Sequence, residues 1–178
     1  MNFAARLVLM ALLALAGMPA HVRAQALAVT SPAFKDQDRM PRTAGCEGGE
    51  HSPPLVVSGV PSEARTLALI MTELDSPKGG AALWMACDIP AAPGVTIAEN
   101  QPKARQMKNG GVQLAGPNGR TGYTGPCPPS GVTRRYAIEV FALDTALNLP
   151  EAATKQEFLL AVEGHILAMG KITGKFKK

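Results

Sequence analysis

Few side chains in this sequence could act as catalytic acids, bases or nucleophiles. Cys127 lies in the segment Gly-Pro-Cys-Pro-Pro, and a catalytic thiolate there would need a neighbouring base to lower its pKa. Outside the N-terminal segment described below, only His51 and His165 could be that base, and their spacing does not place either beside Cys127. The flanking prolines favour a structural loop, so we expect no catalysis by this thiol.

Two carboxylates, Glu73 and Asp75, form the other arrangement with catalytic potential. Glycosidases use two such groups, held apart on either side of the scissile bond. Because Glu73 and Asp75 are only two positions apart on a loop bounded by proline, they give weak support for that chemistry. We therefore expect a structural role for the pair and no enzymatic activity for the chain.

The cysteines indicate a disulfide rather than a metal site. The sequence has three cysteines, Cys46, Cys87 and Cys127. In an oxidising compartment at least one pair should form a disulfide, and because the number is odd, one thiol should stay free. Their spacing contains neither a Cys-x-x-Cys pair nor the mixed His and Cys clusters typical of zinc sites. We expect neither a metal ion nor another cofactor.

The N-terminus has the pattern of a secretory signal. Residues 1–6 carry one positive charge, residues 7–18 are almost entirely apolar, and Val22-Arg23-Ala24 places small residues where signal peptidase cleaves. The apolar run is too short to cross a bilayer, and no cysteine follows it to carry a lipid. We predict a signal peptide over 1–24 and an exported domain over 25–178, in the periplasm or outside the cell.

Charge and aromatic content argue against nucleic-acid binding. The formal net charge of +4 falls to +2 when Arg6 and Arg23 leave with the signal peptide, and several lysines gather near the C-terminus. Nucleic-acid binding favours a dense basic face with stacking aromatic side chains. The aromatic residues here are few and scattered, so we expect a solvated basic tail.

Hydrophobic patterning predicts a mainly β domain. Short apolar runs bounded by Gly and Pro favour strands over 55–58, 66–71 and 82–89, and alternation makes 134–143 the clearest strand, with both faces buried. A last strand is expected over 172–176. Residues 93–129 are rich in Gly, Pro and polar side chains, which predicts a long functional or self-packed loop.

One helix is predicted near the C-terminus. The segment Thr154-Lys155-Gln156-Glu157 fits a capping box, in which the Thr oxygen accepts a backbone N–H and Glu reaches back. Phe158, Val162 and Ile166 follow at helical spacing, which places His165 in the helix as a structural residue.

Four segments together resemble the phosphatidylethanolamine-binding protein family, in its bacterial branch related to Raf-kinase inhibitors. They are TAGCEGGEHSPPL with SGVP (43–55 and 58–61), TELDSP (72–77), GYTGPCPPSG followed by Arg-Tyr (122–131 and 135–136), and ATK with GHILA (153–155 and 164–168). The resemblance implies two packed antiparallel sheets with a C-terminal helix. It also implies a pocket for a small anion such as phosphate or a phosphorylethanolamine-like head group.

The resemblance assigns this pocket to residues from three segments. In the family's pattern the first loop supplies acidic residues and a proline, the next strand a histidine beside a tryptophan, and the signature a Gly-Pro wall, a second histidine and a tyrosine. The corresponding ligand-binding positions here are Glu73, Asp75, Pro77, Leu83, Trp84, Gly125, Pro126, Arg134 and Tyr136. The resemblance also implies a disulfide between Cys46 and Cys127, since both lie in its loop motifs.

Two of these positions depart from the family's pattern. Leu83 and Arg134 stand where the family has histidines, so one imidazole has become an apolar group and the other a permanent cation. Arg134 could hold a phosphate or carboxylate through its planar fork, or it could pair with Glu73 and close the pocket. The sequence leaves both arrangements open.

The leading hypothesis is therefore a periplasmic or secreted binding or regulatory protein with a degenerate anion pocket. The alternative is a protein-interaction module, such as an inhibitor of a protease or kinase, that keeps the pocket only as a vestige and uses segment 93–129 to bind its partner.

Overall fold

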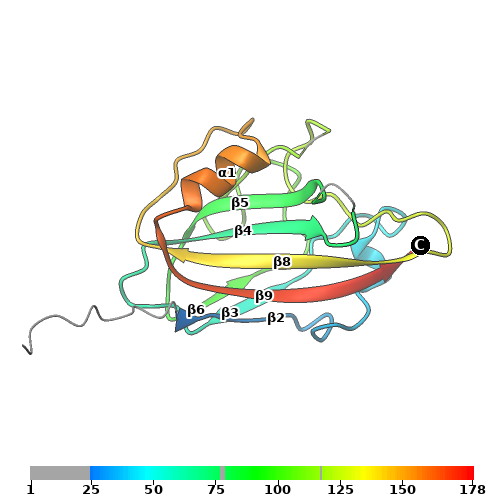
Figure 1. Cartoon of the computed structure of the whole chain (residues 1–178), viewed down its shortest axis with the longest axis horizontal. Coiled ribbons are helices and arrows are strands. Elements are labelled where there is room, and N and C mark those ends of the chain that lie inside the picture. Colours follow the sequence, from blue (N-terminus) through cyan, green and yellow to red (C-terminus); the bar gives the residue numbers. More distant parts are fainter. Residues whose placement is uncertain (1–24, 77–78, 117) are drawn as a thin grey trace, which may run out of the picture.

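The computed structural model describes residues 25–76, 79–116 and 118–178, which form two β-sheets and an α-helix. The elements are β1 Gln25–Ala26, β2 Ala28–Thr30, the 3-10 helix η2 Arg42–Ala44, β3 Leu55–Ser58, β4 Thr66–Glu73, β5 Ala82–Pro90, β6 Gly94–Ile97, β7 Val112–Gln113, β8 Thr133–Leu143, α1 Lys155–Val162 and β9 Ile166–Lys177. The large sheet has the order β1-β9-β8-β4-β5-β7, and the small sheet has the order β2-β3-β6. Figure 1 shows β9, β8, β4 and β5 of the large sheet side by side. The pairs are antiparallel, except that β1 lies parallel to β9. The prediction of a mainly β fold with two packed sheets and a helix near the C-terminus is confirmed.

The large sheet is buried on both faces, as the alternation in β8 predicts. Tyr136, Ile138 and Val140 join the core between the two sheets, while Phe141 and Leu143 join a second core beneath α1. Successive side chains of a strand point to opposite faces, so β8 contributes to both cores in turn. The central strand β4 is buried along almost its whole length for the same reason.

The capping box of α1 is present, but the helix is shorter than the apolar spacing suggests. Thr154 accepts a hydrogen bond from the backbone N–H of Glu157, whose carboxylate accepts one from the backbone N–H of Thr154. The helix ends at Val162, and Gly164, with φ of 83°, turns the chain into β9. The prediction that His165 and Ile166 continue the helix is therefore wrong. The side chain of His165 is exposed, with Nδ1 2.8 Å from Oδ1 of Asp144.

Segment 93–129 contains more regular structure than its composition predicts. Strand β6 pairs with β3 in the small sheet, and β7 pairs with β5 at the edge of the large sheet. Both strands are short, and the surrounding Gly and Pro residues hide their alternation. The final strand is longer than predicted, because the antiparallel pairing between β8 and β9 extends the whole length of β8.

The predicted signal peptide, 1–24, lies outside the described residues. Within the described ranges, no helix is long and apolar enough to cross a bilayer.

Candidate functional site

The end of β4 lies beside the beginning of β8, and this pairing builds the centre of the candidate site. Glu73 and Tyr136 are direct partners in the ladder. Arg134 precedes Tyr136 by two residues, so strand alternation places it on the same face of β8. The pairing therefore gathers three of the predicted pocket residues at one end of the sheet.

Arg134 contacts Glu73 without a hydrogen bond between them. Its Nε lies 3.7 Å from Oε1 of Glu73, with about a third of each side chain exposed (33% and 29%). Nη1 of the same guanidinium donates a hydrogen bond of 2.9 Å to the backbone carbonyl of Asp75. Nε itself is buried and donates to no acceptor among the described residues. The ion pair that the sequence left open is thus present, but in a loose form.

The Tyr136 hydroxyl is a second buried group without a hydrogen-bond partner among the described residues. The side chain belongs to the core between the sheets, with 1% of its surface exposed. Burial, with a smaller contribution from the nearby Glu73 carboxylate, raises the pKa of this phenol above its ordinary value. Tyr136 therefore remains neutral at physiological pH and keeps a proton that it can donate.

Asp75 pairs with Arg135 rather than with Arg134. Its carboxylate accepts hydrogen bonds from the backbone N–H of Arg135 at 2.7 Å and from Nε at 3.0 Å. The hydrogen bonds from the Arg135 side chain, followed by that from its backbone, hold the pKa of Asp75 below its usual value. This bidentate pair pins the loop after β4 to the first residues of β8, and sequence reasoning did not foresee it.

A β-bulge in β5 sets the positions of Leu83 and Trp84. Met71 pairs with Trp84 and Thr72 with Ala82, which leaves Leu83 as the extra residue of the bulge. Bulges redirect side chains, and this one lets the half-buried Leu83 pack against the same core as Trp84. Trp84 is fully buried and donates from Nε1 to Oε1 of Gln113 at 2.8 Å, so it is a core residue. Pro77 lies outside the described residues.

Gly125 and Pro126 join segment 120–127 to the loop that contains Cys46. The backbone N–H of Gly125 donates to Oε1 of Glu50 at 3.0 Å, and the carbonyl of Pro126 accepts from the N–H of Cys46 at 3.1 Å. A Cβ atom on Gly125 would lie 2.6 Å from the carbonyl oxygen of Ala44, so the close approach of the two backbones requires glycine here.

Three polar side chains hold these loops together: those of Glu50, Lys103 and Arg120. None of the three was predicted as a site residue from the sequence. Burial tends to raise the pKa of Glu50, but the hydrogen bonds from Arg120 and from Gly125 outweigh it and hold the value below its usual range. Nζ of Lys103 donates to the backbone carbonyls of Tyr123 and Glu50 and lies 5.3 Å from the centre of the Tyr123 ring. Glu50 and Tyr123 lie inside the motifs that resemble the family, 43–55 and 122–131, and this position was the signal in the sequence that could have identified them.

Tyr123 is the aromatic centre of this region. It is buried, donates from its hydroxyl to the carbonyl of Ala44 at 3.0 Å, and meets the Trp84 ring edge to face at 5.6 Å. Because Trp84 belongs to the sheet and Tyr123 to the loop, this contact fixes the loop against the large sheet.

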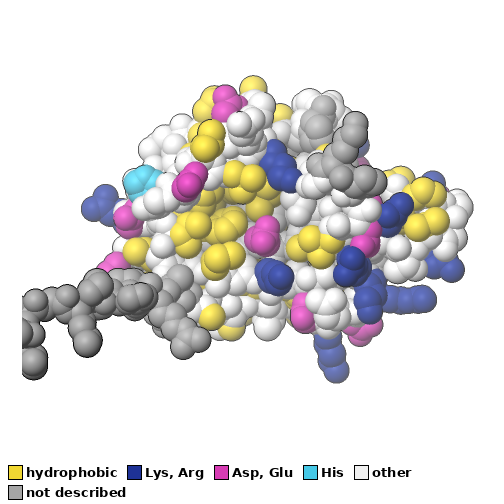
Figure 2. Space-filling model, viewed as in Figure 1, with side chains coloured by type: hydrophobic (Ala, Val, Ile, Leu, Met, Phe, Trp, Pro, Cys, Tyr) yellow, Lys and Arg dark blue, Asp and Glu magenta, His cyan; other side chains and the backbone are white. Residues whose placement is uncertain are grey.

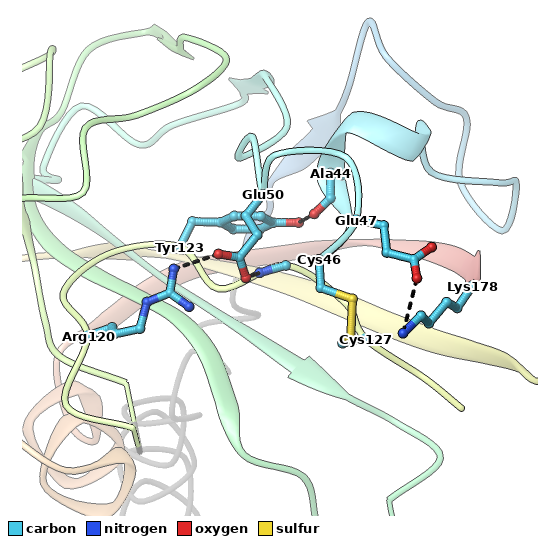
Figure 3. The surroundings of a disulfide bond; sticks show 9 residues. Ala44, Cys46, Glu47, Glu50, Arg120, Tyr123, Cys127 and Lys178 are labelled. Atoms are coloured by element: carbon cyan, nitrogen blue, oxygen red, sulfur yellow. Dashed lines mark hydrogen bonds and ion pairs between the residues drawn. A yellow bond between two sulfur atoms is a disulfide. The ribbon is translucent and has the colours of Figure 1, made fainter. Parts of the chain in front are cut away.

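The predicted disulfide between Cys46 and Cys127 is present. It joins the two loops across 81 residues of sequence, with 5.4 Å between the Cα atoms (Figure 3). Cys87 is the free cysteine, buried in the core beneath α1, where burial raises its thiol pKa to about 12. Cys127 therefore has no free thiol with which to act as a nucleophile.

Two cavities of the described structure lie apart from the predicted pocket. A cavity of about 530 Å³ lies beside the beginning of α1, and a hollow of about 450 Å³ lies along the same helix. Neither is lined by Glu73, Leu83, Arg134 or Tyr136. Within 25–76, 79–116 and 118–178, no group of three or more His, Cys, Asp or Glu side chains could hold a metal ion.

Comparison with known proteins defines the class to which this two-sheet domain belongs. The family model for phosphatidylethanolamine-binding proteins matches residues 30–177. A UPF0098 protein of Methanothermobacter thermautotrophicus is 43% identical over 147 residues, covering 82% of this chain and 95% of the relative.

Two crystal structures have the same fold. CT736, a phosphatidylethanolamine-binding protein homologue from Chlamydia trachomatis, aligns with a TM-score of 0.75 and 33% identity over 86% of this chain and 99% of that one. YbcL of E. coli, a member of the mammalian phosphatidylethanolamine-binding protein family, aligns with a TM-score of 0.76 and 26% identity over 85% and 98%. The chain belongs to the phosphatidylethanolamine-binding protein family.

Proposed function

We propose that this protein is an exported, non-enzymatic binding protein that holds a small anion between Arg134 and Tyr136. The observation that carries the proposal is the pair of buried donors, Arg134 Nε and Tyr136 Oη, that lack acceptors among the described residues. A buried polar group without a partner costs about 1–3 kcal/mol, so two of them on the same face of β8 favour a ligand that supplies acceptors. Phosphate and carboxylate oxygens are such acceptors.

The protonation states of the two donors select an anion over a cation. The guanidinium of Arg134 is permanently charged and offers donors only. The hydroxyl of Tyr136 keeps its proton because burial raises its pKa. One oxyanion could therefore accept a hydrogen bond from each residue, and the bond from arginine would be charge-assisted.

Glu73 favours a zwitterionic ligand over a simple anion. Its carboxylate stands 3.7 Å from Arg134 and would repel an isolated phosphate. In a phosphorylethanolamine-like head group, the phosphate can pair with Arg134 while the ammonium pairs with Glu73. Both charges of the loose ion pair then gain partners, and for this reason we expect such a head group to bind more tightly than inorganic phosphate.

Basic residues surround this end of the molecule. In the sheet pairing, Arg135 lies opposite Lys175 and Thr133 opposite Lys177, and Arg39 forms a further bridge to Lys175. Figure 2 shows many of the Lys and Arg side chains gathered towards the end where the chain terminates. A positive field of this kind raises the local concentration of anions and speeds their association.

The disulfide supports an extracellular or periplasmic location, because such bonds persist in oxidising compartments. The absence of a free thiol at Cys127 and the burial of Cys87 support a role in binding rather than catalysis by a cysteine.

Titration of the protein with phosphorylethanolamine and with inorganic phosphate, followed by calorimetry and by backbone amide shifts of β8, tests the proposal. We expect saturable binding that is lost in Arg134→Ala and kept in Arg42→Ala, an exposed arginine outside the site. Absence of saturable binding in both the wild-type protein and Glu73→Gln would contradict it. Binding in Glu73→Gln alone would mean that the ion pair holds the site shut.

A second candidate function is suggested by exposed apolar side chains beside the same site. Leu74 follows Glu73 and is 47% exposed, and Val132 precedes β8 and is 37% exposed. These residues suit the rim of a protein-docking surface, as in an inhibitor of a protease or kinase with a vestigial pocket. If this candidate is correct, Leu74→Ser weakens capture of a partner protein while Arg134→Ala does not.

A further inference from the structure

The cavity beside the beginning of α1 lies on the opposite side of the large sheet from Tyr136. Its volume of about 530 Å³ lies within the range of small-molecule pockets, about 300–1,000 Å³. Met85, which lines it, belongs to the core beneath α1, whereas Tyr136 belongs to the core between the sheets. The cavity is therefore separate from the proposed anion site.

Small side chains create the cavity. Its walls include Ala82 of β5, Ala115 after β7 and Ala153 before α1, together with Gly80 and Gly116. Methyl groups and bare backbone leave an open space where larger residues would fill it. Because the wall residues offer almost no polar side chains, the cavity suits an apolar molecule.

Lys155 supplies one positive charge to this apolar space. It lines the cavity, and its Nζ donates to the backbone carbonyls of Gly79 at 2.7 Å and Gly80 at 3.1 Å. An ammonium group has three donors, so one N–H remains for another acceptor. In the described part of the chain, no carboxylate lies within ion-pair distance of Lys155, and the nearby Glu157 is engaged by Thr154.

We propose that this cavity binds a small amphipathic anion, such as a short-chain fatty acid, with its apolar chain against Ala82, Ala115 and Ala153 and its carboxylate at Lys155. The carboxylate would accept the remaining N–H of Lys155 as a charge-assisted hydrogen bond at the edge of an apolar site. The chain would displace water from the apolar walls, which is favourable in proportion to the apolar area covered. Neither contact involves Arg134 or Glu73, which do not line the cavity.

Octanoate is a suitable probe, with octanol and acetate as matched probes that lack the charge or the chain. Calorimetry and the 13C-methyl shifts of Ala82, Ala115 and Ala153 would follow binding to the full protein. We expect saturable shifts of these methyl groups with octanoate, affinity about tenfold weaker for octanol, and no saturable binding of acetate. Octanoate shifts that never saturate, or shifts confined to other residues, would overturn the proposal.

Substitutions separate the charge from the cavity. Lys155→Met should lower the affinity for octanoate to that for octanol and leave octanol binding unchanged, whereas Lys155→Arg should retain much of the octanoate affinity. Ala152 is exposed and lines the cavity, so Ala152→Leu should block both ligands, with the exposed Ala146→Leu as the control. Arg134→Ala should bind octanoate as the wild type does. Unchanged octanoate binding in Lys155→Met, or its loss in Arg134→Ala, would refute this site.

Discussion

The Nε atom of Arg134 lies 3.7 Å from Oε1 of Glu73, close enough for an ion pair and too far for a hydrogen bond. This spacing leaves Nε without an acceptor among the described residues, and the hydroxyl of Tyr136, on the same face of β8, is equally unsatisfied. A tight internal ion pair would have used both charges and closed the site. The loose contact leaves donors that a ligand can satisfy.

The first prediction concerns the Tyr136 hydroxyl. Tyr136→Phe removes a buried oxygen that has no partner in the described structure, so the unliganded protein should be unchanged or more stable by up to about 1 kcal/mol. The same substitution should weaken binding of phosphorylethanolamine, because one of its two donors is lost. Chemical denaturation and calorimetry give the two values. Marked destabilisation together with unchanged binding would mean that the hydroxyl has a structural partner instead.

The second prediction concerns pH. An arginine side chain stays charged between about pH 5.5 and 8, whereas a histidine with a pKa near 6.5 gains positive charge as the pH falls. Leu83→His should therefore bind phosphate more tightly than wild type, and the ratio of the two affinities should grow towards pH 5.5. Phosphate itself titrates in this range, but its titration affects both proteins equally and therefore drops out of the ratio of affinities. A ratio that stays constant across this range would place residue 83 outside the anion site.

The third prediction concerns the cysteines. Labelling without reductant should find no rapidly reacting thiol in the native protein, because Cys87 is buried, and one thiol after denaturation. Reduction should raise the number to three. Loss of the bond in Cys46→Ala with Cys127→Ala should lower the free energy of unfolding by about 2–5 kcal/mol, since it joins loops distant in sequence. Three reactive thiols in unreduced, denatured protein would show that the bond does not form.

The fourth prediction concerns Glu50 and acid stability. Its pKa is lower in the folded protein than the ordinary value of 4.5, so its contribution to stability is complete above that value and disappears as the pH falls through the folded pKa. Glu50→Gln should lower the free energy of unfolding by about 1–2 kcal/mol at pH 7, and this loss should shrink as the pH falls below 4.5 and through the folded pKa. Denaturation over a series of pH values down to the acid range measures the change. A loss that stays constant until the protein unfolds would exclude an ionic contribution.

The fifth prediction concerns the helix cap. Thr154→Ala removes the acceptor for the backbone N–H of Glu157 and should cost about 1 kcal/mol of stability. Binding at the Arg134 site should not change, because α1 packs on the other face of the large sheet. Thr154→Ser is the matched control and should retain the cap. A fall in phosphorylethanolamine affinity as large as that of Tyr136→Phe would contradict this separation.

The sequence by itself determined the elements whose signals are local. The alternation of 134–143 predicted β8 and both buried faces, and Thr154 with Glu157 predicted the start of α1, since period and capping need only neighbouring residues. The resemblance of 43–55 and 122–131 to family motifs also predicted the disulfide between Cys46 and Cys127. The end of the helix was missed because Ile166 keeps a helical spacing while it pairs with Leu143 in the sheet.

Only the tertiary structure decided how the charges at the site are paired. Glu73, Asp75, Arg134 and Arg135 allow several pairings, and the register of β4 against β8 selects Arg135 for the Asp75 carboxylate and leaves Arg134 loosely beside Glu73. The cavity at Lys155 likewise depends on alanines from three separate segments meeting in space. Ion pairing and cavity shape follow from distances of a few ångströms between residues far apart in the chain, and no local pattern in the sequence encodes those distances.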